Sequence, residues 1–160
     1  MKKIVFITGA TSGIGLGCAR KFAANGDKLI LTGRNATRLS EISSELKAQG
    51  AEVVTLKFDV RDREAAQKAI ESLPAEWTKI DVLVNNAGLA LGLEPEYEGD
   101  FSDWDGMIDT NIKGLLTMTR LIVPGMIERN SGHIINIGSV AGDAAYAGGN
   151  VYCATKAATT

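Results

Sequence analysis

The strongest constraint on the fold of this chain is a regular alternation of short apolar runs with segments of helical spacing. The apolar runs are rich in β-branched residues and cover residues 3–8, 28–32, 52–58, 81–85 and 133–137. Helical spacing follows over about residues 14–25, 35–49, 61–73 and 101–130, the last of these in one helix or two, and a last helix opens near Asn150. Several runs are apolar at every position, as in a parallel sheet that is covered on both faces. The pattern therefore predicts an α/β fold built on a doubly wound parallel sheet.

The composition narrows the possible partners. The chain has 160 residues, enough for the single domain that we expect over residues 1–160. Its net charge is −2 with no basic stripe, and its apolar runs are too short to cross a bilayer. Neither nucleic acid nor a membrane is therefore expected as a partner. A single histidine and the isolated Cys18 and Cys153 predict no metal site, and such unpaired thiols are typical of a cytoplasmic protein.

Glycine, proline and loop composition predict where the elements end. Gly26 and Gly50 can end helices in the left-handed conformation, which costs glycine little. Pro124 predicts a bend or a break in the long helical stretch. Residues 88–100 and 138–149 have loop composition and follow apolar runs. Both loops would therefore lie at the carboxyl edge of the sheet, where ligands bind in such folds.

The first apolar run leads into a glycine-rich turn, TGATSGIG, over residues 8–15. Glycines at positions 9, 13 and 15 permit a tight turn and a close approach of the backbone to a phosphate. The helix that follows supplies free N–H groups and the positive end of its dipole. In the first strand–helix unit of such a sheet, this turn predicts a dinucleotide-binding site.

The end of the second apolar run indicates which dinucleotide binds. Sites for NAD place a carboxylate there to accept a hydrogen bond from the ribose 2′-hydroxyl, whereas sites for NADP place a cation nearby. Residues 32–35 contain no acid and one arginine, Arg34. The sequence therefore predicts NADP as the cofactor.

Two later strand ends add polar residues to the same edge. Asp59 and Val60 follow the third apolar run. The Asp59 carboxylate could cap the next helix or face the adenine, and the sequence leaves both roles open. The fourth run ends in NNAG, residues 85–88, whose asparagines can tie strand ends together while Ala-Gly leaves room for a flat ligand.

A tyrosine and a lysine stand four residues apart near the end of the chain. Tyr152 and Lys156 begin the last predicted helix, and Ser139 follows the fifth apolar run. On a helix, this spacing places the two side chains on one face, one turn apart. A lysine ammonium favours the phenolate of a neighbouring tyrosine. The pair therefore predicts a proton-transfer site.

Six motifs in this order make the chain resemble the short-chain dehydrogenase/reductase family over its whole length. They are TGATSGIG, Asp59, NNAG, Asn111 within DTNIKG, Ser139 within IGSVAG, and YCATK from Tyr152 to Lys156. Within the family, the chain is most similar to NADP-dependent serine dehydrogenases, also described as 3-hydroxy acid dehydrogenases or malonic semialdehyde reductases. The runs LPAEW, NNAGLALG, MIDTN, GHIINIGS and YAGGNVY carry this closer similarity.

The resemblance implies a Rossmann-like fold and a role for each motif residue. Tyr152 would be the general base in alcohol oxidation and the acid in carbonyl reduction, and Lys156 would hold the nicotinamide ribose. Ser139 would hydrogen-bond the substrate oxygen, so that Ser139 and Tyr152 bind substrate. Asn111 would hold a water in a proton relay toward the lysine. The expected cofactor-binding residues are Gly9, Thr11, Ser12, Gly13, Ile14, Gly15, Arg34, Asn35, Asp59, Val60, Asn86, Gly88, Tyr152 and Lys156.

The expected function is hydride transfer between NADP(H) and a small 3-hydroxy acid such as L-serine or 3-hydroxypropionate. Two alternatives stay open: another reductase of the family, acting on 3-oxoacyl thioesters or carbonyl compounds, and an NADP-binding protein without turnover. Family members continue with further strands and a substrate-covering segment, so we expect the natural polypeptide to extend beyond Thr160. The resemblance also implies a homo-oligomer, a tetramer, with the helices of residues 101–130 available for one interface.

Overall fold

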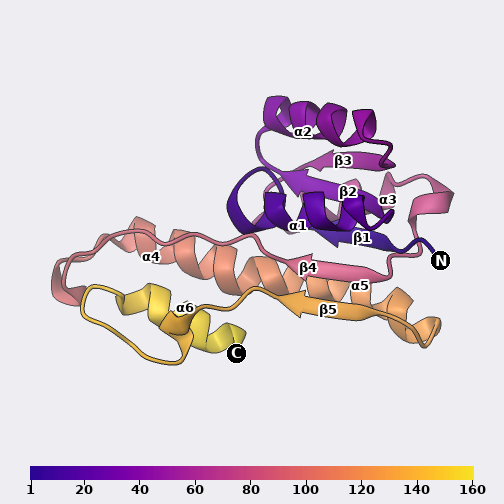
Figure 1. The fold of residues 1–160 in the computed structure, drawn as a ribbon. Helices are drawn as coiled ribbons and strands as arrows, with labels where there is room; N and C mark the ends of the chain where they lie inside the picture. The colour runs from indigo at the N-terminus through magenta and orange to yellow at the C-terminus, as the bar shows by residue number, and fades with distance from the viewer.

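The computed structural model describes residues 1–160 and arranges five strands in one parallel sheet, in the order β3-β2-β1-β4-β5 (Figure 1). β1 pairs with β2 on one side and with β4 on the other, so the strand order reverses beside it. This is the doubly wound parallel sheet that the alternating pattern predicts, and ligands bind at the point of reversal in such sheets. The strands are β1 Ile4–Ile7, β2 Lys28–Gly33, β3 Val53–Lys57, β4 Val82–Asn85 and β5 His133–Asn136.

Six α-helices connect or follow the strands. A π-helical turn, Asp109–Gly114, joins the fourth of them to the fifth without a loop. Short 3-10 turns lie in three of the other connections, at Ala75–Trp77, Glu96–Glu98 and Val140–Gly142. The helices are α1 Gly13–Ala24, α2 Ala36–Ala48, α3 Arg63–Glu71, α4 Phe101–Ile108, α5 Leu115–Glu128 and α6 Asn150–Thr159.

The sheet separates two apolar cores, because successive side chains of a strand point to opposite faces. Phe6 of β1 packs into one core together with Met118 of α5. Its neighbour Ile7 packs into the other core together with Leu39 and Ile42 of α2. Helices α1 and α2 cover one face of the sheet, and α3 and α5 cover the other (Figure 1). The central strands β1 and β4 are therefore covered on both faces, which explains why all their residues are buried.

Glycines and side-chain caps set the ends of the helices. Gly26 and Gly50 take φ values of 86° and 90° after α1 and α2, which confirms the two predicted helix ends. The Asn35 side chain caps α2 by accepting a hydrogen bond from Arg38 N. Asp62 caps α3 in the same way.

Of the bend or break that the sequence predicts at Pro124, the break is wrong, because α5 continues through this residue to Glu128. Met118, Ile122 and Met126, on both sides of Pro124, pack into the core beneath the sheet. Their burial outweighs the local cost of a proline, about 3 kcal/mol in a helix interior. The irregular turn lies instead at Asp109–Gly114.

The C-terminal part of the chain is less enclosed than the rest. β5 is an edge strand with mostly exposed residues, whereas β1 and β4 are buried throughout. α6 lies beyond the carboxyl ends of the strands, beside α4 (Figure 1). Among the helices, none has the length and apolar character needed to cross a membrane.

Candidate functional site

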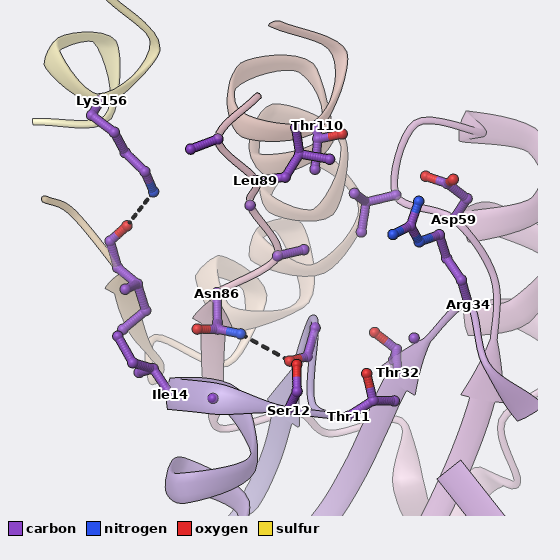
Figure 2. Close-up of a pocket in the computed structure, with 18 of the residues that line it drawn as sticks. Thr11, Ser12, Ile14, Thr32, Arg34, Asp59, Asn86, Leu89, Thr110 and Lys156 are labelled. Carbon is purple, nitrogen blue, oxygen red and sulfur yellow. Dashed lines mark hydrogen bonds between the residues drawn. The ribbon is translucent and has the colours of Figure 1, made fainter. Parts of the chain in front are cut away.

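A cavity of about 440 Å³ opens at the carboxyl edge of the sheet, where the strand order reverses. It is formed by the segments that follow all five strands, by the π-helical turn and by α6 (Figure 2). Twelve of the fourteen residues that the sequence predicts for the cofactor line it: Gly9, Thr11, Ser12, Gly13, Ile14, Arg34, Asp59, Val60, Asn86, Gly88, Tyr152 and Lys156. Gly15 and Asn35 lie outside the lining.

The glycine-rich turn lines the cavity with backbone. Gly9 and Gly13 have φ values of 61° and 51°, a conformation that other residues rarely adopt. Ser12 is extended and its side chain does not cap α1, so the first N–H groups of this helix remain free beside the cavity that Gly13 and Ile14 line. A Cβ at Gly15 would overlap the carbonyl oxygen of Gly9 and the side-chain amide of Asn86. Gly15 therefore permits α1 to pack closely against Gly9 and Asn86, and this packing supports the glycine-rich turn.

Arg34 supplies a cation at the end of β2, and its side chain lies beside Asp59 at one edge of the cavity (Figure 2). Asn35, the next residue, uses its side chain to cap α2. A second cation, Arg38, lies four residues after Arg34 on α2, and the sequence analysis did not single it out. Arg38 Nε donates to the Thr11 carbonyl at 3.3 Å and so ties α2 to the glycine-rich turn.

Asp59 does not cap α3, since Asp62 does, and the capping alternative is therefore wrong. Its carboxylate instead accepts hydrogen bonds from Arg61, with Nη2 to Oδ2 at 2.7 Å and backbone N to Oδ1 at 3.0 Å. The hydrogen bond to the Arg61 guanidinium lowers the pKa of Asp59 below its usual value, and the charge of Arg34 lowers it further. The carboxylate is therefore ionised and already neutralised by Arg61.

The NNAG segment ties the centre of the sheet together, as the sequence predicts. Asn85 Nδ2 donates to Asn136 Oδ1 at 3.0 Å, which links the ends of β4 and β5. Asn86 Nδ2 donates to the carbonyl oxygens of Thr8 and Gly9, each at 3.0 Å. The Thr8 hydroxyl completes this junction, which sequence reasoning missed, by accepting from the backbone N–H groups of Asn86 and Ala87.

The first turns of α6 bring Tyr152 and Lys156 to the same cavity. Lys156 is 8% exposed, and its Nζ donates to the carbonyl oxygen of Ile137 at 3.0 Å (Figure 2). Nζ lies 6.0 Å from the centre of the Tyr152 ring. A Cβ at Gly88 would stand 3.5 Å from Nζ, so this glycine keeps the approach to the ammonium open.

Ser139 and Asn111 lie beside the cavity rather than in its lining. Ser139 Oγ accepts from Ala141 N at 3.2 Å, and the residue directly follows Gly138, which does line the cavity. Asn111 is buried in the π-helical turn, with hydrogen bonds from its side chain to Leu89 and Thr155. Its neighbour Thr110 is part of the lining.

The chain matches the family model of the short chain dehydrogenases over residues 3–160. It is 59% identical over 154 residues to the NADP-dependent 3-hydroxy acid dehydrogenase YdfG of Salmonella typhi, covering 96% of this chain and 61% of that protein. It is 51% identical over 158 residues to sulfoacetaldehyde reductase 2 of Chromohalobacter salexigens, covering 98% of this chain and 62% of that protein.

One solved structure is similar to this chain in both fold and sequence. The closed form of serine dehydrogenase complexed with NADP+ superimposes with a TM-score of 0.90 at 56% identity, over 96% of this chain and 61% of that one. The chain thus spans about three fifths of the length of the curated relatives that it matches.

Proposed function

We propose that this chain, which belongs to the short-chain dehydrogenase family, forms over residues 1–160 a single dinucleotide-binding and catalytic domain. Its function is hydride transfer between NADP(H) and a small 3-hydroxy acid. The observation that carries the proposal is that Tyr152 and Lys156 line the same cavity as the glycine-rich turn and Arg34. One cavity is thus lined both by Arg34, the cation for a 2′-phosphate, and by the proton-transfer pair.

The residues at the carboxyl edge fit NADP. The turn from Gly9 to Gly13 and the first N–H groups of α1 would bind the pyrophosphate. Arg34 would bind the 2′-phosphate, because no carboxylate hydrogen-bonds to its guanidinium and Arg61 already neutralises Asp59. Asp59 and Val60 would face the adenine, and Gly88 leaves room for the nicotinamide ribose beside Lys156.

Bound NADPH supplies the hydride, so the remaining residues need only place the substrate and move a proton. Tyr152 would protonate the substrate oxygen in reduction and accept its proton in oxidation. Lys156, 6.0 Å from the ring centre, would hold the ribose hydroxyls and place a positive charge beside the tyrosine. Ser139 Oγ accepts from Ala141 N, so its own hydrogen remains available to donate to the substrate oxygen.

The surroundings of Asn111 support the proposed water relay toward Lys156. Its Oδ1 and the Lys156 Nζ both flank Gly88, at 3.3 Å and 3.5 Å from where a Cβ of that residue would stand. Oδ1 accepts one hydrogen bond, from Leu89 N, and a carbonyl oxygen has a second lone pair for a water.

The similarity to a 3-hydroxy acid dehydrogenase and to a serine dehydrogenase supports L-serine or 3-hydroxypropionate as the substrate. The similarity to a sulfoacetaldehyde reductase supports the wider class of short aldehydes that carry an acid group. A reductase of 3-oxoacyl thioesters or other carbonyl compounds is the alternative within the family. Ser139, Tyr152 and Lys156 are all present, which favours turnover over NADP binding alone.

We further propose that the protein is a cytoplasmic homotetramer. The free thiols of Cys18 and Cys153 suit a reducing compartment. Leu116 and Ile127 lie three turns apart on one side of α5 and are 58% and 73% exposed, which suits burial against a second copy.

NADPH absorbance during turnover tests the proposed function. Oxidation of L-serine and 3-hydroxypropionate should be followed with NADP+ and with NAD+, and reduction of sulfoacetaldehyde and an acetoacetyl thioester with NADPH. The proposal predicts oxidation of at least one 3-hydroxy acid, much faster with NADP+ than with NAD+. Turnover of the thioester alone would favour the other reductase. Binding of NADPH without turnover of any compound would contradict catalysis.

A further inference from the structure

Thr155 lies between the two residues of the proton-transfer pair and is completely buried, with an exposed fraction of 0%. Its hydroxyl donates to the Tyr152 carbonyl oxygen at 2.8 Å and accepts from Asn111 Nδ2 at 3.0 Å. Lys156 is the next residue of α6. A single hydroxyl therefore joins the backbone that carries Tyr152 and Lys156 to a side chain outside the helix.

Asn111 continues the connection to the loop after β4. Its Oδ1 accepts from Leu89 N and its Nδ2 donates to Leu89 O, both at 2.9 Å. Leu89 lines the cavity beside Gly88. The hydrogen bonds of Leu89, Asn111 and Thr155 thus connect three segments: the loop after β4, the π-helical turn and α6.

Few other polar contacts fix α6. Lys156 Nζ donates to Ile137 O, and Asn150 Nδ2 donates to Glu94 O at the start of the helix. A helix of ten residues is too short to be stable by itself, so tertiary contacts must hold its position. Of these side chains, Thr155 alone is completely buried, and it stands between Tyr152 and Lys156 on the helix.

We propose that Thr155 is a positioning residue for Tyr152 and Lys156, and that it acts through its hydrogen bond to Asn111. This inference rests on the proposed hydride transfer. Removing the hydroxyl leaves a buried N–H of Asn111 with one partner fewer and releases the middle of α6 from the π-helical turn. Displacing a reacting group by about 1 Å can cost about 100-fold in rate, even when the substituted residue touches no substrate.

The test compares three substitutions on α6. Thr155→Val keeps the size of the side chain but removes its hydroxyl, whereas Thr155→Ser keeps the hydroxyl. Thr159→Val is the matched control, since Thr159 Oγ1 donates only to the Thr155 carbonyl, within the helix. We expect Thr155→Val to lower kcat by about 10- to 100-fold. Thr155→Ser and Thr159→Val should keep kcat within about threefold of the unsubstituted protein, and the Kd of NADPH should change by about threefold at most in all three.

Cys153 provides a readout that does not depend on turnover. It lies on α6, is 5% exposed, and packs its sulfur over Gly149. Its labelling by a thiol reagent, separated from that of Cys18 by peptide mass spectrometry, should be faster in Thr155→Val and unchanged in Thr159→Val. If the unsubstituted protein turns over no substrate, the proposed function fails, and the labelling still decides the position of α6.

Three results would overturn the inference. One is a Thr155→Val protein with unchanged kcat and unchanged Cys153 labelling. Another is an equal loss of kcat in Thr155→Ser, because packing rather than the hydroxyl would then matter. The third concerns Asn111→Ala, in which Thr155→Val should add little further loss; a fully additive loss would mean that the two residues act separately.

Discussion

The two halves of the site are held in different ways. On the cofactor side, backbone forms the site: β1 and β4 are buried throughout, and the glycine-rich turn packs against Asn86 with no space for a Cβ at Gly9 or Gly15. On the catalytic side, β5 is an exposed edge strand and α6 is held by side-chain hydrogen bonds. Lys156 reaches Ile137 O, and Thr155 reaches Asn111.

This difference predicts that the affinity for NADP(H) and the reaction rate depend on separate sets of residues. Substitutions in the backbone-built half should change the affinity for NADP(H) and the stability of the sheet together. Substitutions in α6 should change the rate while cofactor affinity stays nearly constant. The predictions below test this separation, beginning with the largest effect.

The largest effect on affinity is expected from Gly15→Ala, whose Cβ would overlap the Gly9 carbonyl oxygen and the Asn86 amide. Overpacking of this kind costs about 1–3 kcal/mol of unfolding free energy. Two misaligned hydrogen bonds to the pyrophosphate, at about 1.5–3 kcal/mol each, would weaken NADPH binding by about 100-fold or more. Thermal unfolding and titration of NADPH fluorescence measure both quantities.

Gly17→Ala is the matched control, since it lies on the same helix and its Cβ would meet nothing within 4 Å. Alanine in a helix interior gains about 0.5–1 kcal/mol over glycine, so stability should rise slightly and affinity should not change. Equal behaviour of the two alanine variants would contradict the role of close packing at Gly15.

A smaller and more selective effect is expected from Arg34→Met. A charge-assisted hydrogen bond contributes about 1.5–3 kcal/mol, so the Kd of NADPH should rise by about 10- to 100-fold. The Kd of NADH, which lacks the 2′-phosphate, should change by about twofold at most. Arg20→Met is the control, because Arg20 pairs with Glu45 between α1 and α2 and does not line the cavity. An equal loss of affinity for both cofactors would assign Arg34 a structural role.

The sequence was most informative where periodicity decides the structure. All five strands and the helices between them follow from the apolar pattern, which is clearest where helices cover both faces of the central strands β1 and β4. Local signals, such as residues suited to cap a helix, predicted the structure less well. Asp59 and Asp62 stand three residues apart, both suited to cap a helix, and only the folded chain reveals that Asp62 does so while Arg61 holds Asp59.

The partners in most contacts between distant segments could not be predicted. The hydrogen bond from Asn111 to Thr155 spans 44 residues, and the one from Asn86 to Thr8 spans 78. No local pattern encodes such pairs, and a buried threonine in a helix looks in the sequence like any other helical residue. At Pro124 the local signal for a helix break was wrong, because burial of the residues around it keeps α5 continuous.

The most direct test of the account is a paired measurement of kcat and NADPH affinity on Tyr152→Phe, which removes one hydroxyl from the cavity lining. A positioned acid or base contributes about 10²- to 10⁴-fold, so kcat should fall by that factor. A neutral hydrogen bond contributes about 0.5–1.5 kcal/mol, so the Kd of NADPH should rise by less than about tenfold. A variant that keeps its rate, or that loses NADPH binding as completely as turnover, would contradict the separation of cofactor binding from proton transfer.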